Sequence, residues 1–298
     1  MDQKPEISAD RPSAKIIALV LLLGLLWGGN SVSIKIGLQG VPPFALATMR
    51  FLLGFAGITL WSLHQRVRLR MNPGELLPLI FVSVIFTLQI STLNLGTQIT
   101  EASRSTIFIS TYPFFTALFA HFWVPGDRLS VRKTVGITLA FGGVLLTFGG
   151  DLKFDSDDYL RGDLIVLLSG CLLGLRTVVT KLIIQSIHPY RLLFWLMVFS
   201  IPCFVISSLF LERGANFHFT ISGVSAIFYQ GIVIAGFCFV SWTSILEKYS
   251  PSRLVVLFFL TPLFGVLLSY LLLGDEIGFG LIVGACLVAY GIYLVNKN

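Results

Sequence analysis

The sequence predicts an all-α membrane protein in which ten transmembrane helices form two inverted five-helix repeats around a central cavity. Three observations support this prediction. The 298-residue chain is 55% hydrophobic and only 12% charged, whereas a soluble domain carries roughly 25% charged residues. Similar segments recur at about half the length of the chain, as in duplicated proteins. The loops that correspond between the two halves differ in charge, as inverted repeats require.

The repeat is visible in the residues themselves. Residues 27–35 and 173–181 are two versions of one segment, 146 positions apart. Later positions recur at offsets of 146 to 149: Pro43 as Pro189, Ser103, Arg104 and Pro113 as Ser252, Arg253 and Pro262, and Gly136 and Gly143 as Gly284 and Gly291. Such a period in an apolar chain indicates a duplicated membrane bundle.

The order of polar and apolar segments divides the chain. Residues 1–14 are polar, and the apolar stretch after them is too long for a cleavable signal, so we expect a cytoplasmic tail. The first repeat covers 15–149, an outer loop covers 150–161, and the second repeat covers 162–296. Each predicted span is long enough to cross a core of about 30 Å as a helix. The spans are 15–36, 43–63, 74–97, 101–123, 131–149, 162–184, 190–211, 220–246, 252–273 and 278–296.

Charge predicts the orientation. With the N-terminus inside, fourteen Lys and Arg residues fall on the inner side and five on the outer side, a strong positive-inside bias. Both termini are then cytoplasmic. The basic inner loop 128–133 corresponds to the acidic outer loop 274–276, and the inner loop with three arginines, 66–70, corresponds to the near-neutral outer loop around Glu212. This inversion of charge predicts repeats of opposite topology.

Two residues deep in the membrane come first among the candidate binding residues. Asn30 lies about 15 residues from the inner end of its helix, or about 22 Å along the axis, and Arg176 is its repeat counterpart. An intramembrane Arg costs at least ~2.5 kcal/mol and indicates a functional site by default. Its donors can bind a carboxylate or phosphate. The alternative is that Arg176 pairs with a backbone carbonyl or extends toward the inner surface.

Polar and aromatic residues on other helices complete the predicted pocket. Trp27 shares a helix face with Asn30 at a spacing of three, beside glycines that loosen the helix. An aromatic pocket with a few donors suits an amphipathic organic solute, although such residues also serve as packing or lipid-facing groups. The further candidates are Gln89, Asn94, Tyr112, Tyr229, Gln230 and Trp242.

Other residues are expected to have structural roles. Arg50 is close enough to the start of its helix to reach the outer interface or to cap helix ends. Lys35 and Lys181 are expected to be interfacial anchors. Pro113 and Pro262 are predicted mid-helix kinks that suit gating. Small residues predict close packing of the fifth and tenth helices: Gly136, Ala140, Gly143, Ala285 and Ala289.

Several kinds of chemistry lack a signature. No protease, hydrolase or P-loop motif occurs, and the four cysteines lie in apolar segments without metal-ligand spacing, so we expect neither an enzyme nor a cofactor or metal. No Asp or Glu lies at the centre of a predicted helix. Because proton-coupled carriers commonly use buried carboxylates, this pattern favours facilitated diffusion, or coupling through a group that the sequence does not reveal.

Taken together, these motifs resemble the EamA type of the drug/metabolite transporter superfamily over residues 15–296. The resemblance rests on Trp27-Gly28-Gly29-Asn30 followed by Lys35, Pro43 to Arg50-Phe51, Ala102-Ser103 to Pro113, Asp127-Arg128-Leu129-Ser130, Ser250-Pro251-Ser252-Arg253 to Pro262, and Gly274-Asp275-Glu276. The family mostly has Glu at position 127 and a small or neutral residue at position 176. The Arg at 176 points to a distinct, anionic substrate.

The resemblance implies a cavity that opens alternately to each side of a bacterial inner membrane. We expect export of a small metabolite such as an amino acid, with substrate and lipid as partners and no nucleic acid. The sequence does not fix the oligomeric state. A carrier for phosphorylated or other anionic solutes ranks lower because only Arg176 is predicted to be deep, and a non-transporting scaffold is the remaining alternative.

Overall fold

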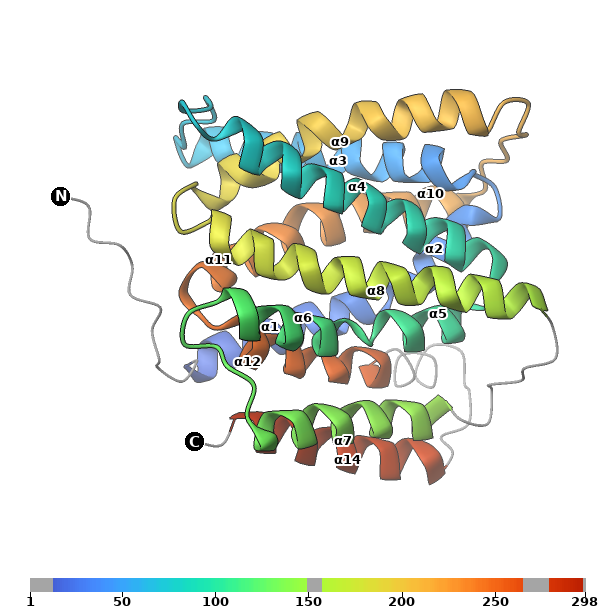
Figure 1. Cartoon of the computed structure of the whole chain (residues 1–298). Helices are drawn as coiled ribbons and strands as arrows, with labels where there is room; N and C mark the ends of the chain where they lie inside the picture. Colours follow the sequence, from blue (N-terminus) through green and yellow to red (C-terminus); the bar gives the residue numbers. More distant parts are fainter. Residues whose placement is uncertain (1–12, 149–156, 265–278, 297–298) are drawn as a thin grey trace.

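The computed structural model describes residues 13–148, 157–264 and 279–296, which form a bundle of long helices with roughly aligned axes (Figure 1). Within these ranges the chain contains helices and no strands, so the predicted all-α class is confirmed. Six helical segments in these ranges are long and apolar enough to cross a membrane: Ala14–Leu38, Pro43–His64, Leu76–Ile99, Tyr159–Ile183, Pro189–Leu211 and Ile221–Lys248.

The helices of each half follow one another in the same order. The first half contains α1 (Ala14–Gly28), α2 (Asn30–Leu38), α3 (Pro43–His64), α4 (Leu76–Ile99), α5 (Ala102–Ile109), α6 (Tyr112–Trp123) and α7 (Val131–Phe148). The second half contains α8 (Asp157–Ile183), α9 (Pro189–Leu211), α10 (Ile221–Phe228), the π-helix η1 (Tyr229–Cys238), α11 (Phe239–Lys248), α12 (Pro251–Val255), the 3-10 turn η2 (Val256–Phe259) and α14 (Phe279–Asn296).

Two predicted continuous helices are interrupted. The segment predicted at 15–36 breaks at Gly29, and the segment predicted at 101–123 breaks between Ile109 and Tyr112. Pro113 is therefore not a mid-helix kink: it is the second residue of α6, where its missing N–H has no partner to lose. Its repeat counterpart, Pro262, lies in a helical stretch just after η2.

Some predictions fall on residues that the structure does not describe. These include most of the expected tail at 1–14, the greater part of the outer loop expected at 150–161, and the acidic loop at 274–276. The end of that expected outer loop is already helical, because α8 begins at Asp157. Asp163, which follows in this helix, is fully buried.

The connections between helices divide between the two ends of the bundle. The α3–α4, α6–α7, α8–α9 and α11–α12 connections lie at one end, on the left in Figure 1, where α1 also begins and α14 ends. The α2–α3, α4–α5 and α9–α10 connections lie at the opposite end. The arginines of loop 66–70 and the basic residues of loop 128–133 are therefore at the same end of the molecule. We call it the basic end.

Helices α7 and α14 pack side by side along their whole length (Figure 1). A Cβ atom on Gly291 would lie 2.4 Å from the carbonyl oxygen of Gly136, and one on Gly143 would lie 2.5 Å from that of Gly284. Such contacts require glycine on both helices, which confirms the predicted close packing. Ala289, however, is exposed, and the closest described contacts of α14 with α7 are made at Gly284 and Gly291. The side chain of the other predicted residue, Ala285, lies outside those that the structure describes.

This packing predicts that Gly291→Ala destabilises the protein. The added methyl group meets backbone atoms, which cannot move aside as a flexible side chain does, and overpacking of this kind costs about 1–3 kcal/mol. We expect a lower melting temperature of the purified protein in detergent. Gly142→Ala on α7 is the matched control: its Cβ would meet nothing within 4 Å, so it should leave the melting temperature unchanged or raise it. Equal stability of the two variants would contradict the prediction.

Candidate substrate-binding cavity

A cavity of about 120 Å³ lies between the two halves of the chain. This exceeds the roughly 10–15 Å³ that one water molecule requires. Both halves contribute to its wall, which is lined by Trp27, Asn30, Ser31, Arg50, Gln89, Ile90, Leu93, Thr106, Ile109, Ser110 and Tyr112 from the first half, and by Leu173, Arg176, Thr177, Ile234, Phe239, Trp242, Phe258 and Thr261 from the second. The cavity therefore suits a small solute.

One side of the cavity is an aromatic wall. Trp27, Trp242 and Phe258 contact one another edge to face, with ring centroids 5.0 to 6.4 Å apart. Trp27 lies at the end of α1, one residue before the helix ends at Gly28, whereas the other two rings come from α11 and η2. Edge-to-face pairs hold rings in fixed orientations, so this wall is a rigid surface for the apolar part of a solute.

Arg176 is held against rings on another side of the cavity. Its guanidinium carbon lies 5.1 Å from the centroid of Phe86 and 5.4 Å from that of Phe239. Within the described residues no hydrogen bond or ion pair to this guanidinium is found. Neither structural role considered for Arg176, pairing with a carbonyl or reaching the inner surface, is seen here. Its donors are available to a ligand.

Arg50 is a second cation in the same cavity, and its predicted place was wrong. The side chain does not reach the outer interface; Arg50 is 2% exposed and packs over Phe51, 4.4 Å from the ring centroid. Its Nη1 donates to Gln230 Oε1 at 3.2 Å, and its Nε is buried without a partner in the described part of the chain. A second partly unpaired guanidinium thus lines the cavity.

Three uncharged groups around the cavity also retain hydrogen-bonding capacity. The Asn30 Oδ1, Gln89 Oε1 and Thr261 Oγ1 atoms are buried and have no partner among the described residues. The orientation of the Gln89 amide follows from its neighbour: the Ser169 hydroxyl donates to the Gln89 backbone oxygen, so it must accept from Gln89 Nε2 at 3.1 Å. Unpaired buried polar atoms are costly, and a bound polar solute would satisfy them.

The structure brings six of the nine predicted binding residues to the cavity wall and places three away from it. Lining the cavity are Trp27, Asn30, Gln89, Tyr112, Arg176 and Trp242. Asn94 instead donates to the Pro43 carbonyl at 2.8 Å, and Tyr229 donates to the Leu26 carbonyl beside the break between α1 and α2. Gln230 holds Arg50 and donates to the Ser33 carbonyl at 2.9 Å, so it positions a cavity residue from behind.

The repeat-related lysines cap helix ends. Lys35 donates to the carbonyls of Thr97, Gln98 and Thr100 at the end of α4. Lys181, which is fully buried, donates to the carbonyls of Leu246 and Glu247 at the end of α11. The predicted role as interfacial anchor is therefore wrong for Lys181. A cation at these positions satisfies the unpaired carbonyls that every helix end exposes.

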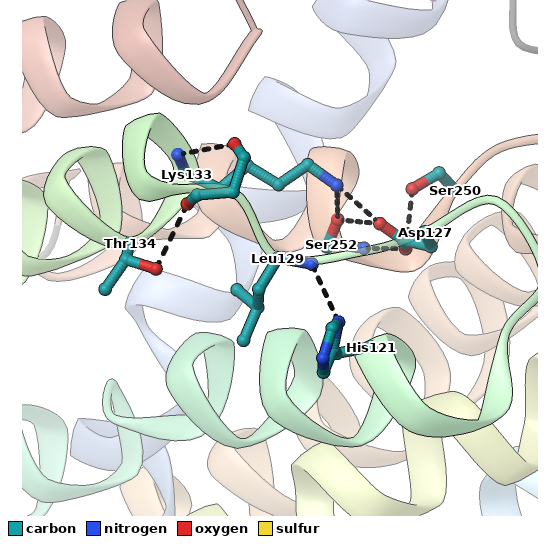
Figure 2. Close-up of polar contacts among 8 residues, drawn as sticks. His121, Asp127, Leu129, Lys133, Thr134, Ser250 and Ser252 are labelled. Atoms are coloured by element: carbon teal, nitrogen blue, oxygen red, sulfur yellow. Dashed lines mark hydrogen bonds and ion pairs between the residues drawn. The ribbon is translucent and has the colours of Figure 1, made fainter.

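A polar cluster joins the two halves at the basic end (Figure 2). Asp127, in the α6–α7 connection, accepts from the Ser250 hydroxyl at 2.6 Å and from the Ser252 backbone N–H at 3.1 Å, at the start of α12. The Ser252 hydroxyl also donates to it. Lys133 Nζ completes the cluster at 2.7 Å from Asp127 Oδ1. The carboxylate therefore caps the N-terminus of α12 across the boundary between the halves.

A second buried polar cluster joins the halves at the opposite end. Arg104 on α5 forms an ion pair with Asp163 on α8, and the Thr100 hydroxyl donates to the same carboxylate at 2.7 Å. All three side chains are buried. Further carboxylates also join the halves: Glu75 pairs with Arg191 at 2.6 Å, and Glu212 accepts from the backbone N–H groups of Phe44 and Ala45.

Comparisons with known proteins agree with a membrane transporter. The model of the EamA-like transporter family matches residues 14–149 and again residues 160–297. An uncharacterized transporter of Archaeoglobus fulgidus is 29% identical over 294 residues, covering 96% of this chain and 99% of the relative. The uncharacterized transporter YoaV of Bacillus subtilis is 24% identical, covering 94% of this chain and 96% of its own.

Two further similarities bear on function and fold. A protein of Escherichia coli named "probable amino-acid metabolite efflux pump" is 26% identical and covers 95% of each chain. A solved crystal structure with 18% sequence identity superposes with a TM-score of 0.80 over 96% of this chain and 99% of its own, which supports the fold alone. The fold and the cavity define a polytopic membrane transporter. The chain belongs to the EamA-like transporter family, within the drug/metabolite transporter superfamily.

The Asp127 cluster predicts a pH-dependent contribution to stability. Burial on its own raises the pKa of Asp127, but the Lys133 charge and the hydrogen bonds from Lys133, Ser250 and Ser252 outweigh it and lower the pKa below its usual value. A carboxyl whose pKa falls on folding stabilises the folded state above its unfolded pKa, about 4, and loses that contribution as the pH falls through the folded value. Asp127→Asn should therefore cost about 1–3 kcal/mol at neutral pH.

The measurement is the melting temperature of wild type and variant across pH. The gap between them should be constant from about pH 8 to about pH 5 and should shrink below about pH 4, as the pH falls toward the lowered pKa at which the folded Asp127 takes up a proton. Asp127→Glu keeps the charge and serves as the matched control, with a smaller loss. A gap that widens in acid, or no gap at neutral pH, would contradict this assignment.

Proposed function

We propose that this protein is a secondary transporter that exports a small organic metabolite, an amino acid or related amphipathic solute, across a bacterial inner membrane by alternating access. The observation that carries the proposal is the cavity lined by both halves, in which an aromatic wall faces polar atoms that lack partners among the described residues. Binding sites of carriers lie at such repeat interfaces. The name of the Escherichia coli relative supports the solute class and the direction.

The proposal includes ten helices in two inverted five-helix repeats. It is supported by the two matches of the family model and by helix breaks at corresponding places, before Pro113 in one half and at η2 before Pro262 in the other. The basic end contains the loops 66–70 and 128–133, the start of α1 and the end of α14. By the positive-inside rule this end is cytoplasmic, and so are both termini.

The two polar clusters suggest how access alternates. Asp127 joins the halves at the basic end and Asp163 joins them at the other. Rocking of one half against the other would separate one cluster while keeping the second closed. The breaks before Pro113 and near Pro262 would serve as the bending points, because both follow short interrupted helices that also line the cavity. Without a carboxylate among the described lining residues, we propose facilitated diffusion rather than proton coupling.

The transport assay should distinguish a carrier from a membrane scaffold. The purified protein is reconstituted in liposomes loaded with one unlabelled solute, and uptake of the same radiolabelled solute is measured for individual amino acids and small organic acids. A carrier exchanges the two pools, so transient accumulation that saturates with concentration is expected for one class. Absence of saturable exchange for every solute tested would refute the proposal.

Trp242→Ala tests whether this cavity is the transport site. The substitution removes a ring that contacts both Trp27 and Phe258, and each aromatic contact contributes about 0.5–1.5 kcal/mol. We expect the KM for exchange to rise about tenfold. Trp123→Ala is the matched control, because Trp123 lies at the exposed end of α6 outside the cavity. An unchanged KM in folded Trp242→Ala would place the site elsewhere.

A further inference from the structure

The charge of the cavity is unbalanced. Arg50 and Arg176 both line it, and their two positive charges repel each other. Among the described residues that line the cavity there is no Asp or Glu. The buried carboxylates of the described chain are engaged elsewhere: Asp127 with Lys133, Asp163 with Arg104, and Glu75 with Arg191. The protein thus leaves two positive charges facing the cavity without a carboxylate among its described lining residues.

The two guanidiniums are held on one aromatic platform. Arg50 packs over Phe51, and Arg176 packs between Phe86 and Phe239. These three rings contact one another, with centroids 4.9 to 6.2 Å apart. Apart from the bond of Arg50 Nη1 to Gln230, no hydrogen bond to these guanidiniums is found within the described residues, so their other donors remain available. Planar donor edges of this kind match carboxylate and phosphate oxygens.

Gln230 fixes one of the two arginines. It accepts from Arg50 Nη1 while donating to the Ser33 carbonyl, so the position of the Arg50 fork is set from the side away from the cavity. Arg176 has no hydrogen-bonding partner within the described residues and is restrained only by its rings. The pair therefore combines a fixed cation with an adjustable one, which lets the site close around a bound anion.

We propose that Arg50 and Arg176 form an anion subsite for a small solute that carries two negative charges, as a dicarboxylate or a phosphate monoester does. This inference rests on the proposed transporter and narrows its solute from an amino acid to a small organic dianion. A dianion balances both guanidiniums, whereas a neutral or zwitterionic solute leaves them uncompensated. Asn30 and Gln89 add unpaired amide oxygens that accept from a hydroxyl or ammonium group on the same solute.

Binding measured on the purified protein tests the subsite without relying on transport. The melting temperature is recorded in uncharged detergent at low salt against succinate, its monoamide succinamate and its diamide succinamide, three solutes of similar shape with falling charge. Glycerol 3-phosphate and glycerol form a second pair. A ligand that binds the folded state raises the melting temperature by mass action. We expect saturable shifts for a dianion at concentrations at least tenfold lower than for the monoanion, and none for the uncharged solutes.

Variants assign the effect to the two arginines. Arg176→Gln and Arg50→Gln should each weaken dianion binding at least tenfold, whereas Arg70→Gln, which removes the same charge from an exposed loop residue, should not. If either Gln variant fails to fold, Arg176→Lys keeps the charge without the fork and should weaken binding less than removal of the charge. The comparison of succinate, succinamate and succinamide on the wild-type protein tests the subsite even if no variant folds.

The outcomes separate this inference from the proposed function. A shift with succinate alone identifies dicarboxylates, and a shift with glycerol 3-phosphate alone identifies phosphate monoesters; both support the subsite. No shift with either dianion, or equal shifts with charged and uncharged partners, overturns it. Saturable liposome exchange of a neutral amino acid together with no dianion binding would keep the transporter and reject the subsite. Dianion binding without any exchange would keep the subsite and reject the transporter.

Discussion

Inside a bilayer a backbone or side-chain polar group has no water to bind, so each interruption of a helix needs a partner supplied by the protein. The described bundle meets this need with long-range contacts. Tyr229 binds a carbonyl beside the break at Gly29, Asn94 binds the Pro43 carbonyl, and Lys35 and Lys181 bind the ends of α4 and α11. Of these contacts, that of Tyr229 lies at the break between α1 and α2, which both line the cavity.

The same lack of water inside a bilayer makes the unpaired polar groups of the cavity significant. Polar side chains elsewhere in the described bundle largely find partners, as Asp127 and Asp163 do in their clusters. Around the cavity, Asn30, Arg50 and Gln89 retain buried donors or acceptors without partners in the described part of the chain. The ends of α4 and α11 have hydrogen-bonding partners, whereas these cavity atoms do not. We therefore interpret the unpaired cavity groups as partners for a solute. The open groups and the aromatic wall together define the site.

The sequence predicted the class of fold and a large part of the cavity because depth along a helix and repeat symmetry are visible in residue order. Trp27, Asn30 and Arg176, singled out on that basis, line the cavity. The direction in which a side chain points could not be predicted in the same way. Asn94 is of a residue type that often binds ligands, but its side chain donates to the Pro43 carbonyl. Arg50 was misplaced because its distance from a helix end allowed it to reach the interface, whereas its actual position depends on Gln230, 180 residues away. The sequence signal that could have placed Arg50 at the cavity was its charge within an apolar span.

The π-helix η1 lies in a helical segment whose length differs between the two halves. Helix α4 begins 145 positions before its counterpart α10 but ends 149 positions before the end of α11, and the helical segments contain 24 and 28 residues. The extra residues of the second copy thus lie within a membrane span, not in a loop. A π-helix has wider turns than an α-helix, so it can absorb inserted residues. An alignment of the two halves must therefore open its gap in the middle of this helix, where alignment methods usually penalise gaps most.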